Sequence, residues 1–255
     1  MTVAAVPNRK RAPRNRARAR AKPDAVGMAA VCRARRIVRE LGGRFSIELG
    51  IEVDRHPGEV ERWGLAATLF GNRIPAEIAM RTYRVLERAG VRTIEDAGRR
   101  TAPELVALLD EGGYARYDER TAARLLALAH VLADGYDGRL GALGDQIADP
   151  AELEPALRHL PGWGPVTVHA FLRELRGVWP GAAPELDDRT MRAARHLEFP
   201  AELEGLSELA TAAHLGIRDL EAALVRLSLC HRLESCPGGE ECPLASFEAG
   251  QLKHF

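Results

Sequence analysis

The chain has 255 residues, 46% of them hydrophobic, which is enough for one large or two medium domains with packed cores. No run approaches the roughly 18 uninterrupted apolar residues of a membrane span, and the N-terminus is Arg-rich where a secretory signal is apolar. We therefore expect a cytoplasmic protein without a membrane partner.

Charge is distributed unevenly along the chain. Residues 9–22 carry eight cations, and the first acid is Asp24. The other 28 basic residues stand against 36 acidic ones, so the chain after this segment has a net charge of −8 and lacks a broad positive field. We expect residues 1–24 to be a disordered tail, either an arm that neutralises phosphates or a solubilising terminus.

Helices dominate the predicted elements. Apolar residues at three- and four-residue spacing predict helices, in chain order, at 31–41, 59–70, 76–89, 102–109, 120–133, 150–159, 166–175, 189–197, 202–215 and 219–230. Period-two alternation over a useful length is missing. The predicted fold class is all-α.

The segment Leu160–Pro165 (Leu-Pro-Gly-Trp-Gly-Pro) separates two of these helices. Glycine allows positive φ and has no Cβ, so a phosphate can approach the backbone amides that begin the next helix, whose dipole favours an anion. On its own, this pattern fits two structures equally well: a helix-hairpin-helix motif at about 150–176 that holds a nucleic-acid backbone, and an ordinary helix–helix turn. The candidate DNA-binding residues here are Gly162, Trp163, Gly164, Val166 and Thr167.

The residues after this turn extend the pattern: an apolar helix, a Gly/Pro loop, and then Leu186-Asp187 with Arg192 five residues after the Asp. Together with the turn, they resemble the endonuclease III-like branch of the helix-hairpin-helix DNA glycosylase superfamily. Upstream, Leu65–Asn72 is similar to the family's first core helix, and Gly113-Tyr114 to its intercalating loop.

The resemblance implies two helical lobes with a DNA cleft between them. Residues 59–182 would form the central lobe, ending in the hairpin. Residues 25–58 and 183–255 would form the terminal lobe, with a cysteine loop at its end.

Asp187 is the candidate catalytic residue. Releasing a base breaks an N-glycosidic bond through a cationic, sugar-like transition state, which a carboxylate can stabilise while it orients or deprotonates a water. Its structural alternative is a helix N-cap, and the two roles are compatible. Asp188 is the alternative carboxylate.

Strand cleavage is not expected. Bifunctional relatives place a lysine two residues after the second hairpin glycine, where its amine forms a Schiff base. Val166 stands there, and the only lysines are Lys10, Lys22 and Lys253.

A flipped base also needs a side chain to fill the gap in the duplex and a pocket to receive it. The resemblance suggests Asn72 and Tyr114 for the inserted group, although Tyr114 fits a packing role equally well. Trp163 could stack on a sugar or cap the turn. His169 is a candidate pocket residue, with a core or surface histidine as the alternative.

Three cysteines, Cys230, Cys236 and Cys242, stand near the C-terminus with five residues in each interval. Many relatives carry a four-cysteine iron–sulfur loop at this place, but one ligand is missing here and the spacing differs. An iron–sulfur cluster completed by His231 or an acid, a zinc site, and a loop of free thiols all stay open. The predicted chemistry itself requires no cofactor.

These patterns predict a monofunctional DNA glycosylase: a DNA repair enzyme, monomeric and nucleoid-associated, that acts on double-stranded DNA. The alternative is a non-catalytic protein that binds DNA or senses its structure with the same scaffold.

Overall fold

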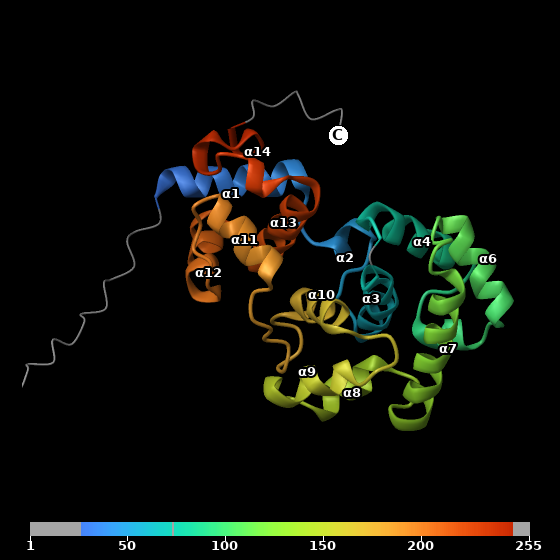
Figure 1. Cartoon of the computed structure of the whole chain (residues 1–255). Coiled ribbons are helices and arrows are strands. Elements are labelled where there is room, and N and C mark those ends of the chain that lie inside the picture. Colours follow the sequence, from blue (N-terminus) through green and yellow to red (C-terminus); the bar gives the residue numbers. More distant parts are fainter. Residues whose placement is uncertain (1–26, 73, 247–255) are drawn as a thin grey trace, which may run out of the picture.

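The computed structural model describes residues 27–72 and 74–246, and over these residues it is helical without a β-strand (Figure 1). The predicted all-α class is confirmed for this part of the chain. The expected basic tail at 1–24 lies outside the described residues. None of the described helices is both long and apolar enough to cross a membrane.

The longer helices follow the predicted order, with short helices between them. Their bounds are α1 Met28–Leu41, α2 Phe45–Glu48, α3 Pro57–Phe70, α4 Ala76–Arg88, α5 Ile94–Gly98, α6 Ala102–Gly112, α7 Asp118–Gly135, α8 Leu140–Gln146, α9 Pro150–Arg158, α10 Pro165–Leu175, α11 Asp188–His196, α12 Leu203–Ala212, α13 Ile217–Cys230 and α14 Pro243–Ser246, with 3₁₀ turns η1 Leu233–Ser235 and η2 Gly239–Glu241.

Local signals explain where several helices begin. Thr93 and Thr101 cap α5 and α6 through reciprocal capping boxes with Asp96 and Glu104. A proline stands in the first turn of α3, α9 and α10, where its missing N–H costs no helical hydrogen bond. The two helices that flank the glycine turn are therefore defined locally.

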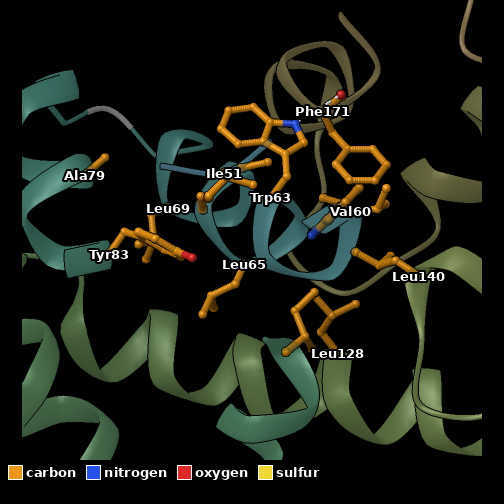
Figure 2. Packing of buried hydrophobic residues seen from close by; sticks show 14 of the residues in the cluster. Ile51, Val60, Trp63, Leu65, Leu69, Ala79, Tyr83, Leu128, Leu140 and Phe171 are labelled. Atoms are coloured by element: carbon orange, nitrogen blue, oxygen red, sulfur yellow. Dashed lines mark hydrogen bonds between the residues drawn. The ribbon is translucent and has the colours of Figure 1, made fainter. Parts of the chain in front are cut away.

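Buried apolar side chains form two clusters. The central cluster contains residues from α2 through α10 and two residues of α13, and the terminal cluster contains residues of α1 and α11–α14 with adjoining loops. Figure 2 shows part of the central cluster around Trp63 of α3, whose indole Nε1 donates to the Phe171 carbonyl of α10 at 3.2 Å. This contact fixes α10 against α3.

Residues 45–53 precede the predicted lobe boundary at residue 58 and contribute to the central cluster. Phe45, Leu49, Ile51 and Val53 were expected in the terminal part but are buried in the central cluster. The centroids of the Phe45 ring and of the Phe70 ring, at the end of α3, are 5.2 Å apart. Burial of these apolar side chains places α2 in the central cluster, whereas α1 contributes to the terminal cluster.

Candidate active site

The turn between α9 and α10 presents its backbone to solvent. Gly162 and Gly164 are exposed, as is Val166, at 47%. Gly162 has a φ of +80°, and a Cβ there would lie 3.0 Å from Arg124 Cδ, so conformation and space both favour glycine. Since Gly164 is the N-cap of α10, the unpaired amides of the first helical turn follow directly.

Trp163 and Thr167 face inward and support this turn. Trp163 is 2% exposed, and its Nε1 donates to Thr68 Oγ1 at 3.0 Å. Thr167 is buried against Gly71 at the end of α3. Of the two roles considered for Trp163, burial favours packing under the turn over stacking on a sugar, because a large aromatic side chain with its N–H satisfied is stable in the core.

Tyr114 is also buried, so the packing interpretation holds for it. Its hydroxyl donates to the Leu69 carbonyl and accepts from Asn72 Nδ2 at 2.9 Å, and burial raises its pKa to about 12. Tyr114 therefore does not present a side chain for insertion into DNA in this structure. Asn72 is half-buried and stays closer to the surface.

Arg124 of α7 connects Asn72 with the glycine turn, and the sequence patterns did not single it out. Its Nη1 donates to Asn72 Oδ1 at 3.3 Å, while its aliphatic carbons lie beside Gly162. The structure thus brings Asn72, Arg124 and Gly162 to one place. The only signal in the sequence was a cation in an otherwise apolar stretch of α7.

Asp187 is the N-cap of α11. Its Oδ1 accepts from the Thr190 backbone N–H at 2.7 Å, and its Oδ2 lies 3.9 Å from His169 Nε2. Burial is the largest influence on Asp187 and raises its pKa, but the hydrogen bonds from Thr190 and the charges of His169 and Arg173 together outweigh it and hold the pKa of Asp187 below its usual value. One oxygen thus caps the helix while the other faces a histidine. The alternative, Asp188, is exposed, as is Arg192.

His169 lies on α10, facing Asp187, with its side chain 18% exposed. Burial, and then the nearby charge of Arg173, lower its pKa to about 4, so the imidazole is neutral at neutral pH. Its Nε2 is buried without a hydrogen-bond partner among the described residues. Because 3.9 Å is too long for a direct hydrogen bond, the pair is close but not bonded.

A buried ion pair holds the loop that leads to Asp187. Arg176 donates from Nε and Nη2 to the two carboxylate oxygens of Glu221 on α13, both at 3.1 Å, and from Nη2 to the Pro184 carbonyl at 2.8 Å. Glu221 is fully buried, and burial raises its pKa. This two-pronged geometry connects α10, α13 and the loop before α11. Arg176 and Glu221 were not among the predicted residues.

The C-terminal cysteines separate in the structure. Cys236 and Cys242 approach His196 and His231 in a group that could hold a metal ion. Cys230 is exposed at the end of α13, where its thiol donates to the Leu227 carbonyl, and it does not belong to this group. The expected ligand Cys230 is thus replaced by two histidines, of which only His231 was considered from the sequence.

Comparison with protein-family models found no match, and comparison with curated proteins found none either.

Proposed function

We propose that the protein is a monofunctional DNA glycosylase, which hydrolyses the N-glycosidic bond of a damaged or mismatched base flipped out of duplex DNA. The observation that carries the proposal is the placement of Asp187. Its carboxylate caps α11 and faces neutral His169, which lies five residues, or about 7.5 Å of helix, beyond the Gly164 N-cap. A surface suited to a phosphate thus stands close to a carboxylate suited to a cationic transition state.

The chemistry needs no further group on the protein. As the bond between C1′ and the base breaks, the electron pair leaves with the base, and the ionised Asp187 stabilises the positive sugar. A water held between Asp187 Oδ2 and His169 Nε2 attacks C1′ through its oxygen. Its proton passes to the carboxylate, and the departing base takes up a proton from solvent.

The product in this proposal is an abasic site in an uncut strand. The chain has no lysine between Lys22 and Lys253, and the hairpin position that carries the amine in bifunctional relatives is Val166. Schiff-base formation on α10 is therefore excluded by the residues present.

The DNA in this proposal lies across the face that carries the glycine turn, with the helices of the two clusters as the lobes on either side. The first amides of α10 would bind a phosphate, and Arg124 beside Gly162 would add a positive charge there. Asn72, which Arg124 contacts, is the candidate for the inserted side chain.

The test is a panel of duplexes, each with one uracil, alkylated, oxidised or mismatched base, incubated with an excess of the full-length protein. Alkali then cleaves the strand wherever a base was released. Cleavage that requires alkali supports the proposal, and cleavage without alkali contradicts its monofunctional part. Tight binding to an abasic duplex with no release from any substrate would favour the non-catalytic alternative.

A further inference from the structure

Four side chains with metal-binding atoms converge at the C-terminal end of α11. They are His196, His231, Cys236 and Cys242, and one ligand atom from each lies within 4.8 Å of every other. His196 is the last residue of α11, and the other three are the C-cap residues of α13, η1 and η2. Four chain segments thus end at one point.

The spacing of these atoms fits a single tetrahedral ion. Zinc binds a histidine nitrogen at about 2.0–2.1 Å and a thiolate at about 2.3 Å, which puts nitrogen and sulfur about 3.6 Å apart on a tetrahedral edge. His231 Nε2 and Cys242 Sγ are 3.7 Å apart. His196 Nε2 is buried without a hydrogen-bond partner among the described residues, which is costly for a polar atom unless a ligand satisfies it.

An iron–sulfur cluster, the group that the resemblance suggests for this loop, does not fit these residues. A four-iron cluster needs four ligands, each on a different iron and therefore farther apart, and only two cysteines are present here. In a two-iron cluster with two histidines, the histidines and cysteines bind different irons. A His–Cys pair at 3.7 Å instead suits ligands of one ion.

Residues around the four side chains allow these segments to come close together. Gly238 has a φ of +80°, and a Cβ there would lie 2.6 Å from the His196 carbonyl oxygen, so only glycine lets the loop come this close to α11. Arg33 of α1, itself 8% exposed, forms ion pairs with Glu198, two residues after His196, and with Glu240, two residues before Cys242. A cation at the C-terminal end of α11 is also favoured by the helix dipole.

We propose that His196, His231, Cys236 and Cys242 form a structural zinc site. Four protein ligands leave no position for a substrate, so the ion joins α11 to the loop after α13 and takes no part in chemistry. The site concerns the fold of the terminal cluster and does not depend on the proposed base release.

The experiment measures metal in the full-length protein purified without chelators. We expect about one zinc ion per chain and no iron. Cys236→Ser and His196→Ala should each lower the zinc content at least about tenfold, whereas Cys230→Ser, a cysteine on the same stretch outside the group, should keep it.

If these variants do not fold, cobalt(II) exchanged into the wild-type protein provides a second test of the site. We expect the visible spectrum of tetrahedral cobalt with thiolate ligands. Stoichiometric iron, a chain that binds neither zinc nor cobalt, or an equal loss of zinc in Cys230→Ser would overturn the proposal.

Discussion

The two ends of α11 are built differently. At its N-terminal end, Asp187 caps the helix through a hydrogen bond to Thr190, three residues away, and faces His169. At its C-terminal end, His196 meets His231, Cys236 and Cys242, which stand 35 to 46 residues further along the chain. The first end is specified largely by neighbouring residues, and the second depends on the whole terminal cluster. Changes at the N-terminal end should therefore affect the proposed base release as well as stability, whereas changes at the C-terminal end should affect stability alone.

Asp187→Asn should have the largest effect on the proposed base release. Asparagine caps a helix about as well as aspartate, so stability should change little, whereas loss of the charge should slow single-turnover base release by about 10²–10⁴-fold. Asp188→Asn is the matched control, because Asp188 is exposed next to it. Equal losses in both variants would contradict the assignment.

Arg176→Ala should be the most destabilising change near the N-terminal end. It leaves the fully buried Glu221 without its partner and the Pro184 carbonyl without its donor. Removing one partner of a buried ion pair costs about 3–5 kcal/mol, which denaturant unfolding would measure. Arg176→Met combined with Glu221→Gln should recover part of this loss. A single-variant cost below about 1 kcal/mol would show that the pair does not hold the loop.

Chelation tests the C-terminal end. A zinc ion present at roughly a hundred times its Kd stabilises the folded state by about 3 kcal/mol, so its removal should lower the unfolding temperature by about 6–12 °C. Base release measured well below that temperature should fall much less than in Asp187→Asn. A loss of activity as large as that of the variant would show that the two ends of α11 are not independent.

Acid should destabilise the N-terminal end through His169. Its pKa is about 4 in the folded protein and about 6.5 when exposed, so between these values the unfolded chain binds more protons. Stability is therefore complete above pH 6.5 and falls as the pH drops toward 4, by an amount of order 2–3 kcal/mol after allowance for partial exposure. His169→Gln should flatten this slope in urea unfolding. An unchanged slope would mean that His169 is protonated in the folded state.

The smallest effects on stability are expected at the two turn glycines. Gly162→Ala should cost about 1–2 kcal/mol because of its positive φ. Gly164→Ala should cost about 0.5 kcal/mol, since its φ is −84° and its Cβ would enter open space. If a phosphate occupies that space, Gly164→Ala should weaken duplex binding in a titration while the fold stays intact. Unchanged binding would place the DNA elsewhere.

Strongly periodic helices were predicted well, and short ones were missed. The predicted helix at 76–89 is found as α4 Ala76–Arg88, and that at 166–175 as α10 Pro165–Leu175. The helices α2, α5 and α8 have four, five and seven residues, too few to show a 3.6-residue period. They form because tertiary packing buries residues such as Phe45 and Ile94.

The roles of individual residues were predictable to the same extent: roles set by neighbouring residues could be predicted, and roles set by tertiary packing could not. An Asp before a helical pattern predicts an N-cap, and Asp187 is one. By contrast, an aromatic residue beside glycine has the same local pattern whether it faces solvent or the core, so the burial of Trp163 and Tyr114 was not decided by their neighbours. His196 carried no signal at all, because its partners are far along the chain.

Four features could be predicted from the sequence alone: the helical class, the glycine turn, the Asp that caps α11, and the lack of a lysine between Lys22 and Lys253. These depend on backbone conformation and hydrogen bonds between residues a few positions apart. Helix packing is what places His169 opposite Asp187, Arg176 against Glu221, and His196 and His231 beside Cys236 and Cys242. Such pairings follow from how helices pack when apolar surface is buried, and helical periodicity alone does not specify them.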